Sequence, residues 1–325
     1  MKLSHFRRSI RGIAIGAVAL LTVGGLAGCA GASASGGDAG ELQNVTVGVL
    51  TSLDVAPVYL AQQEGFFEEA GLNVTFEIAQ GGAALIPAVV SGQYQFGFSN
   101  LISLMVARDK GLPLQIVQAG SQSTNNIPDY SAILVAGDSP MKSAKDLEGK
   151  TVAVNTLGAN GELTIRQSVR KAGGDPDKVN FVELSYPDMI GAISSGQIAG
   201  GFAVEPFVTL NIGSGNRPLA WNFMDVGPNT AVAGYFTAET TDPALVDKFV
   251  AAMTKAQAFA QENPDAVRAI IPTFSDMDPA LIAQVVLPAY PTELNLESAQ
   301  TLADLALQDG FVSKPVDLKA LFRSE

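Results

Sequence analysis

Two similar stretches of sequence decide the fold. The first is Ser91-Gly92-Gln93-Tyr94-Gln95-Phe96-Gly97-Phe98-Ser99-Asn100, and the second, about a hundred residues later, is Ser195-Gly196-Gln197-Ile198-Ala199-Gly200-Gly201-Phe202-Ala203-Val204. Each stretch follows an apolar run typical of a helix, turns at Ser-Gly-Gln, and leads into a short strand that contains Gly-Phe. A polar or charged loop then follows, Ser99-Asn100 in the first copy and Glu205-Pro206 in the second. The repeat predicts two related α/β lobes whose loops face each other.

Strand-like and helix-like segments alternate along the rest of the chain. Strands are expected at 45–50, 73–78 and 114–119, and again at 151–154 and 179–184, with helices between them. This alternation predicts an α/β fold in which each lobe is a mostly parallel sheet covered by helices. Residues 131–136 are interpreted as an apolar strand at the first crossing between the lobes, and residues 230–237 as the strand that returns. Four helices are expected beyond it, at 243–262, 264–271, 279–287 and 296–308.

Residues 1–28 have the pattern of a bacterial export signal. A basic start precedes an apolar run from Ile13 to Val23, which is too short for a comfortable membrane span. Leu26-Ala27-Gly28-Cys29 then resembles a lipobox, where the signal is removed and Cys29 is lipidated. An ordinary secretory signal with a chance cysteine is the alternative, and the Arg7-Arg8 pair leaves Sec and twin-arginine export both open. Residues 29–40, rich in Gly, Ala and Ser, are expected to form a flexible tether.

The composition excludes several kinds of function. Four of the twenty basic residues lie in the export signal, which leaves 16 basic against 32 acidic residues, and such a surface should repel nucleic acid. Cys29 and His5 are the only cysteine and histidine, so the mature chain has no histidine and no thiol other than the lipidated one. A Ser-His-Asp triad, a Cys-His dyad and most zinc sites are therefore excluded. We predict a protein without catalytic residues, metal or cofactor, and not an enzyme.

The candidate binding residues lie in loops at the carboxyl ends of the expected strands, where open α/β sheets bind ligands. These loops are rich in hydroxyls, amides and glycines, and several of them begin helices, whose N-termini attract anions. They contain no Lys or Arg, so an oxyanion would be held by amide and hydroxyl donors. A neutral heterocycle, or a zwitterion with its amine on Asp54, Asp188 or Glu205, fits equally well. The predicted ligand-binding residues are Thr51, Ser52, Asp54, Gly81, Gly82, Ser99, Asn100, Ser121, Gln122, Asn155, Thr156, Tyr186 and Glu205.

Each of these residues also has an explanation that needs no ligand. Ser99-Asn100 could cap the following helix, and Gly81-Gly82 could serve only a tight turn. Asp54 could be a solvated or helix-capping acid, and Glu205-Pro206 a turn before a helix. Tyr186 could belong to the core or to the rim of a cleft. The binding prediction therefore depends on the convergence of these loops in one cleft.

Four segments of the chain resemble a known protein family. Ala56-Pro57-Val58-Tyr59-Leu60-Ala61, Glu64-Gly65-Phe66-Phe67 and Gly71-Leu72-Asn73-Val74 are similar to the opening of the substrate-binding proteins of ABC importers. Lys145-Asp146-Leu147-Glu148-Gly149-Lys150-Thr151-Val152-Ala153-Val154 is similar to the entry to that family's second lobe. The most similar group is the nitrate/sulfonate/taurine and thiamine-pyrimidine-precursor type. The resemblance covers most of residues 45–240 and specifies no ligand.

The resemblance implies a two-lobed periplasmic-binding-protein fold of type II with two hinge crossings. Residues 41–136 and 230–325 would form lobe 1, with the helical tail packed on it, and residues 137–229 would form lobe 2. It further implies a lipid-anchored, extracytoplasmic protein, expected to be a monomer, that delivers a small organic solute to an ABC permease and its ATPase. Sulfonate- or taurine-like, pyrimidine-like and aromatic acid ligands all remain open. A ligand-sensing receptor of the same fold is the alternative, and a pyrimidine-precursor enzyme is disfavoured because such synthases need histidine and cysteine.

Overall fold

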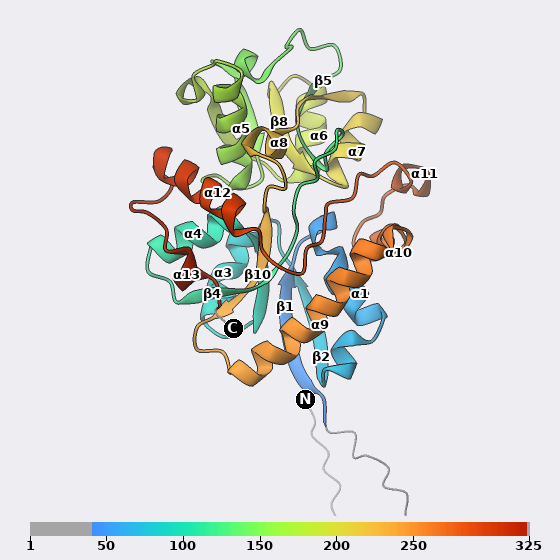
Figure 1. The fold of residues 1–325 in the computed structure, drawn as a ribbon. Coiled ribbons are helices and arrows are strands. Elements are labelled where there is room, and N and C mark those ends of the chain that lie inside the picture. Colours follow the sequence, from blue (N-terminus) through green and yellow to red (C-terminus); the bar gives the residue numbers. More distant parts are fainter. Residues whose placement is uncertain (1–40, 324–325) are drawn as a thin grey trace, which may run out of the picture. The chain divides into compact units, whose positions relative to one another are not determined.

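Two five-stranded sheets of the same design form the framework of the molecule (Figure 1). The computed structural model describes residues 41–323. Within them the first sheet has the strand order β2-β1-β3-β10-β4 and the second the order β7-β6-β8-β5-β9. The strands are β1 (Gln43–Val49), β2 (Leu72–Ile78), β3 (Phe96–Asn100), β4 (Leu114–Ala119), β5 (Ser131–Ala136), β6 (Thr151–Val154), β7 (Asn180–Glu183), β8 (Gly200–Val204), β9 (Asn216–Ala220) and β10 (Ala233–Ala238). In each sheet four strands run in one direction and one strand, β10 or β5, runs in the other, so these are mixed sheets, and the predicted α/β lobes are confirmed.

Helices cover both sheets, and several begin just beyond a strand. The described helices are α1 (Ala56–Gln63), α2 (Phe66–Glu69), α3 (Gly82–Val90), α4 (Leu101–Asp109), α5 (Asn160–Lys171), α6 (Tyr186–Ser194), α7 (Phe207–Gly213), α8 (Asn222–Val226), α9 (Pro243–Glu262), α10 (Pro264–Ile270), α11 (Pro279–Ile282), α12 (Leu296–Gln308) and α13 (Leu318–Leu321). Among residues 41–323, no helix combines the length and the apolar character needed to cross a membrane. The export signal, the lipobox and the tether that we predict lie outside the described residues.

The repeated Ser-Gly-Gln turn has the same backbone geometry in both copies. Gly92 and Gly196 have φ values of 79° and 72°, a region that glycine enters without a steric penalty. After the turns, the N–H groups of Gln95 and Ala199 donate to carbonyl groups of Thr46 and Thr151, at 3.0 and 2.9 Å. Each turn therefore places its strand beside the first strand of the lobe, β1 or β6. The predicted internal repeat is confirmed at the level of the backbone.

The predicted boundary between the lobes is wrong at residues 131–136. β5 pairs with β8 and β9, so the chain has already crossed to the second sheet before Ser131. The return strand is where it was expected, since β10 pairs with β3 and β4 of the first sheet. A fully apolar strand carries no signal for the sheet that it joins, because its side chains suit the interior of either one. The strands of the second sheet consequently span residues 131–220.

The two crossings between the sheets lie side by side. Residues 120–130 lead from the first sheet to the second, and residues 221–232 lead back. The N–H of Ser123 donates to the carbonyl of Thr230 at 2.9 Å, and the N–H of Val232 donates to the carbonyl of Ser121 at 3.0 Å. The crossings therefore form a short antiparallel ribbon, which is the arrangement expected of a two-stranded hinge.

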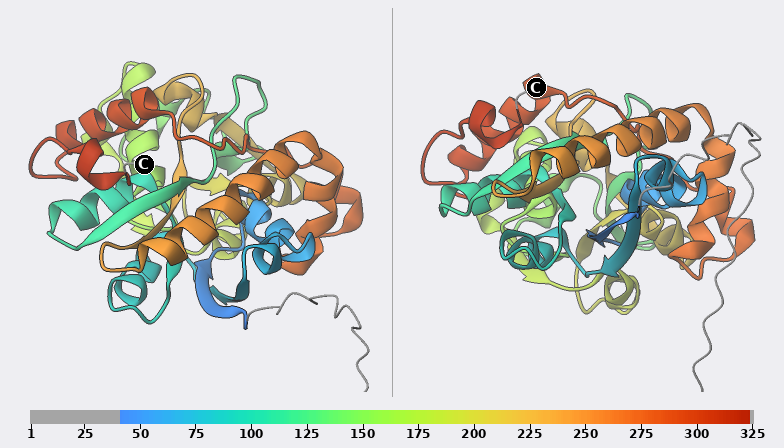
Figure 2. Two further views of the ribbon diagram at one scale, coloured as in Figure 1. Left: turned by 60° about the horizontal axis from the view of Figure 1, so that its bottom comes forward. Right: turned by 90° about the horizontal axis from the view of Figure 1, so that it is seen from below.

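The helical tail packs on the first lobe, as the family resemblance implies. Figure 2 shows α9 running across this lobe, where it contacts α1, α2 and β4. Phe249 of α9 is fully buried and stacks on Phe96 of β3, with ring centroids 3.8 Å apart. α12 packs on α4 and contributes Leu302 to the same apolar cluster as Leu104.

Helix α11 ends at Ile282, although we expected it to continue to residue 287. The backbone that follows bonds elsewhere: the N–H of Val286 donates to Oε1 of Glu205 at 3.1 Å, and the N–H of Tyr290 donates to the side chain of Gln261 at 2.8 Å. Residues 283–290 therefore lie against the second lobe and α9 as an irregular segment.

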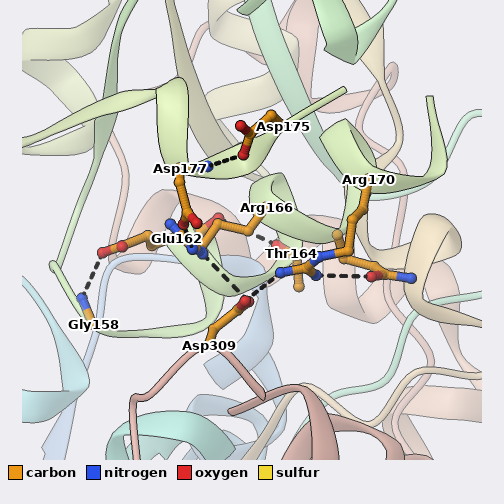
Figure 3. Close-up of polar contacts among 10 residues, drawn as sticks. Gly158, Glu162, Thr164, Arg166, Arg170, Asp175, Asp177 and Asp309 are labelled. Carbon is orange, nitrogen blue, oxygen red and sulfur yellow. Dashed lines mark hydrogen bonds and ion pairs between the residues drawn. The ribbon is translucent and has the colours of Figure 1, made fainter. Parts of the chain in front are cut away.

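An ion-pair cluster joins the tail to the second lobe (Figure 3). Asp309 follows α12, and its carboxylate binds Arg170 and, at 3.3 Å, Nε of Arg166, both of which lie on α5. The side chain of Asp309 is only 3% exposed. Arg166 also binds Asp177, whose side chain is 78% exposed and belongs to the second lobe itself. Arg166 thus has one buried partner across the lobes and one exposed partner within its own lobe.

We expect Asp309→Asn to lower the free energy of unfolding by about 3 kcal/mol, because it leaves two partly buried guanidinium groups without their shared charge partner. Asp177→Asn is the matched control, since it removes an exposed carboxylate from the same Arg166, and it should cost less than about 1 kcal/mol. Urea unfolding of both variants measures the difference. Equal effects would contradict the distinction between the buried and the exposed partner.

Candidate ligand-binding site

A cavity of about 40 Å³ lies at the carboxyl ends of strands from both sheets. Its wall combines apolar side chains with a few hydroxyl, amide and carboxylate groups. The lining residues are Leu50, Ser52, Asp54, Gly82, Phe98 and Asn100 from the first lobe, Asn155, Asn160, Gly161, Tyr186, Phe202 and Val204 from the second, and Phe223, Val232 and Ala233 from the returning crossing and β10. This volume corresponds to about three water molecules.

The predicted loops do converge. Six of the thirteen predicted binding residues line the cavity: Ser52, Asp54, Gly82, Asn100, Asn155 and Tyr186. Gly81 and Thr156 approach each other from opposite lobes beside it, since a Cβ on Gly81 would lie 2.6 Å from Oγ1 of Thr156. Thr51 precedes Ser52, and Ser99 is buried against Gly82. Ligand binding by any of the thirteen stays a prediction.

Three of the predicted residues are engaged away from the cavity wall. Ser121 and Gln122 belong to the first crossing, where Gln122 pairs with Ala231 and Ala289 in isolated bridges. Glu205 accepts hydrogen bonds from N–H and Oγ1 of Thr209, at 3.0 and 2.8 Å, and is 1% exposed. These contacts with α7 therefore favour the alternative role of Glu205, as part of the turn before a helix.

Asp54 is held in the wall by hydroxyl groups from three parts of the chain. It lies in the short 3-10 turn Leu53–Val55 after β1 and is 4% exposed, so the alternative of a solvated loop acid is wrong. Ser52 Oγ donates to Oδ2 at 2.7 Å, while Ser121 Oγ and Tyr130 Oη donate to Oδ1 at 2.5 and 3.1 Å. Burial raises the pKa of Asp54, and these hydrogen bonds oppose that rise. Ser121 and Tyr130 flank the first crossing, so Asp54 connects the cavity to the hinge.

Four helices begin at the cavity. Gly82 opens α3, Asn100 caps α4, Asn160 opens α5 and Tyr186 opens α6. Asn100 accepts a hydrogen bond from the N–H of Ser103 at 2.9 Å, which confirms its capping role. The positive dipole ends of these helices favour an anionic or hydrogen-bond-accepting group in the cavity, although the first N–H groups of α4 already donate to Val232, Asn160 and Asn100. The described wall contains no lysine or arginine.

The sequence reasoning missed two kinds of wall residue. Asn160 joins the lobes, because its Oδ1 accepts from the N–H of Ile102 at 3.3 Å and its Nδ2 donates to the carbonyl of Val232 at 2.9 Å. No sequence signal distinguishes it from any other helix-opening asparagine. Phe98 and Phe202 are the Gly-Phe aromatics of the two repeats and both face the cavity. Their equivalent positions were visible in the sequence and could have identified them.

Neither a metal site nor a larger groove competes with the small cavity in the described part of the chain. No group of three or more His, Cys, Asp or Glu residues between 41 and 323 is placed to hold a metal ion. A larger groove of about 770 Å³ lies beside β4 and α9, but the first lobe and the tail alone line it. The small cavity, by contrast, lies at the carboxyl ends of strands of both sheets and is lined by loops of both lobes.

Two sheets with this strand order, joined by two crossings and meeting at a shared cavity, define the two-lobed fold of periplasmic binding proteins. The fold matches that of the periplasmic aliphatic sulphonate-binding protein SsuA from Escherichia coli with a TM-score of 0.70, at 20% identity, over 86% of this chain and 97% of that one. The profile of the family described as NMT1/THI5 like matches residues 52–267. The chain belongs to this family.

Curated relatives of the chain are mostly binding proteins. The taurine-binding periplasmic protein of Escherichia coli (strain K12) is 26% identical over 74% of this chain and 67% of its own length. A putative aliphatic sulfonates-binding protein of Bacillus subtilis (strain 168) is 22% identical over 90% of each chain. A 4-amino-5-hydroxymethyl-2-methylpyrimidine phosphate synthase of Schizosaccharomyces pombe is 24% identical over only 46% of this chain. The expected family and fold are thus confirmed, while the ligand stays open.

We expect Gly81→Ala to weaken closure of the lobes without unfolding either one, because its Cβ would meet Thr156 of the opposite lobe. Gly82→Ala should instead destabilise the first lobe, since its Cβ would lie 2.6 Å from Cα of Ser99 in the same lobe. Thermal unfolding separates the two, and small-angle scattering should show a larger radius of gyration for Gly81→Ala alone. Replacing Thr156 by Ala in that variant should reverse the expansion, and persistence of the expansion would contradict the contact.

Burial raises the pKa of Glu205 to about 7, from 4.5 for the unperturbed group. The folded protein therefore holds this proton more tightly than the unfolded chain, so the contribution of Glu205 to stability is present below about pH 4.5 and is lost as the pH rises through about 7. Asp54 and Asp129, whose pKa values burial also raises, act in the same direction.

Glu205→Gln isolates this one group. Its free energy of unfolding, relative to the unaltered protein, should rise by on the order of 3 kcal/mol between about pH 4.5 and pH 8. Urea unfolding across that range measures it. A difference that does not change with pH would show that Glu205 ionises normally in the folded protein.

Proposed function

We propose that this protein is the substrate-binding component of an ABC importer, which captures a small organic solute between its lobes and delivers it to a permease. The observation that carries the proposal is the cavity whose wall is built by facing loops of both lobes and by the returning crossing. A solute there would touch both sheets at once. Membership in a family with taurine- and sulfonate-binding relatives supports the same role.

Capture would work through the relative stability of closed and open arrangements of the lobes. The ribbon formed by the two crossings is the natural hinge, and closure of hinged lobes around a ligand is a known device. A ligand shifts such an equilibrium only through its greater affinity for the closed form. Contacts with Asn155, Asn160 and Gly161 on one side, and with Asp54, Gly82 and Asn100 on the other, would supply that difference.

The wall favours an organic solute over the smallest hard anions. It offers helix N-termini and amides for an accepting head group but no basic side chain, and aromatic rings for an apolar part. Tyr186 stacks on Phe207 at 5.0 Å between ring centroids and presents one edge of the aromatic wall. A taurine- or sulfonate-like solute, a pyrimidine-like heterocycle and an aromatic acid all fit this chemistry.

The proposal also covers export, lipid anchoring and docking on the permease. Lipidation of Cys29 after removal of residues 1–28 would anchor the chain outside the cytoplasm, and residues 29–40 would tether it. From there the monomeric, loaded form would dock on a permease that works with an ATPase. A sensor of the same fold would share everything up to docking. A permease gene beside this one, and uptake that fails when the protein is deleted, would favour the importer.

We expect one class of solute to raise the thermal unfolding midpoint of the protein. Binding to the folded state alone adds about 2.7 kcal/mol of stability at a hundredfold excess over Kd. The panel should contain taurine, alkanesulfonates, nitrate, pyrimidines and aromatic acids. Asn160→Ala is the matched variant, because it removes a bridge between the lobes and should reduce the shift.

Small-angle scattering with the same solutes tests the mechanism separately. A solute that raises the midpoint should also reduce the radius of gyration. A panel that leaves both quantities unchanged would overturn the proposed capture of these solutes.

A further inference from the structure

We propose that the solute carries a cationic nitrogen, such as a protonated amine or an amidinium, which binds the carboxylate of Asp54. This inference rests on the proposed function and specifies the chemical class of its ligand. The sequence left Asp54, Asp188 and Glu205 as three equal candidates for such a contact. The structure separates them by their positions.

Asp54 is the one charged residue among those that line the described cavity. Asp188 is exposed and bonds to Ser185 at the start of α6. Both carboxylate oxygens of Glu205 are bonded to protein groups, in Thr209 and Val286, and the residue does not line the cavity. Of the three acids, only Asp54 is therefore placed to touch a solute.

The hydrogen bonds of Asp54 suit an ionised carboxylate with room for another donor. Its three protein partners are hydroxyl groups, all placed to donate: Ser121 and Tyr130 to Oδ1, and Ser52 to Oδ2. A carboxylate offers about four lone-pair sites, so these three donors leave one, on Oδ2. None of the partners carries a positive charge, and no lysine or arginine within residues 41–323 forms an ion pair with Asp54.

A buried carboxylate without a cation is costly, and a cationic ligand offsets that cost on binding. The described surroundings of Asp54 supply hydroxyl hydrogen bonds but no cation. Tyr130, Tyr186, Tyr235 and Tyr290 have raised pKa values, because of their burial and then of the Asp54 charge, so they remain neutral. Asp54 itself lines the cavity, so a solute there can contact it.

The helix N-termini at the cavity have the opposite preference to Asp54. The N-termini of α3, α4 and α5 favour an accepting or anionic group. A solute with a cation at one end and an acceptor at the other therefore matches both parts of the wall. A solute with the acceptor alone would leave Asp54 buried without a cationic partner.

Matched pairs of solutes test this inference on the unaltered protein. Taurine is compared with 2-hydroxyethanesulfonate and ethanesulfonate, and 4-amino-5-hydroxymethyl-2-methylpyrimidine with its 4-hydroxy analogue, by calorimetric titration. We expect the amino member of the pair that binds to have at least about a tenfold lower Kd. Equal affinities within a binding pair would overturn the cation assignment and leave the proposed function intact. Absence of binding by every member would overturn the proposed function and this inference with it.

Asp54→Asn assigns the preference to one residue. It keeps the volume of the side chain and removes its charge, so the ratio of Kd values within the pair should fall to about one. Asp138→Asn, on an exposed loop of the second lobe, is the control with the same charge change and should keep the tenfold ratio. A folded Asp54→Asn protein that retains the preference would show that Asp54 only connects the loop to the hinge. If that variant does not fold, the comparison of solutes on the unaltered protein still decides the matter.

Discussion

Backbone pairing between the two crossings is the constraint on which the rest of the molecule depends. Residues 121–123 and 230–232 bond to each other; the first crossing leads on to β5, and the second runs directly into β10. Each of these strands occupies an interior position of its sheet, between two strands that run the other way. The ribbon therefore fixes where the carboxyl ends of both sheets meet. Val232 and Ala233, at the end of the ribbon, are themselves part of the cavity wall.

The two ends of α5 have different roles: its N-terminus lines the cavity, and its later turns make the ion pair with the tail. The N-terminus of α5 contributes Asn160 and Gly161 to the cavity, and its later turns carry the arginines that bind Asp309. The basic side chains of this helix are thus engaged by acids away from the solute. Asp54 has no such partner among the described residues, only hydroxyls. The same helix therefore carries both the contacts at the cavity and the ion pair with the tail.

The sequence predicted what depends on local pattern and failed where contacts between distant segments decide. Ser-Gly-Gln, with glycine at a positive φ, predicted both turns and the strands after them. The apolar strand 131–136 was assigned to the wrong lobe, because nothing local selects between two sheets. Asp54 and Glu205 both follow strands, yet only Asp54 lines the cavity, and its three hydroxyl partners include two from 67 and 76 residues away. Asn160 bridges the lobes through contacts 58 and 72 residues away, which no local pattern records.

The position of β10, which belongs to the first sheet but follows the second sheet in the sequence, also favours an order of assembly. All five strands of the second sheet come from one continuous stretch of chain, so this sheet can form from local sequence alone. The first sheet has a gap between β3 and β4 until β10 arrives, and β10 follows the entire second sheet in the sequence. Pairings between such distant segments form slowly. The first lobe, and with it the cavity, is therefore expected to be completed only after the second lobe has formed.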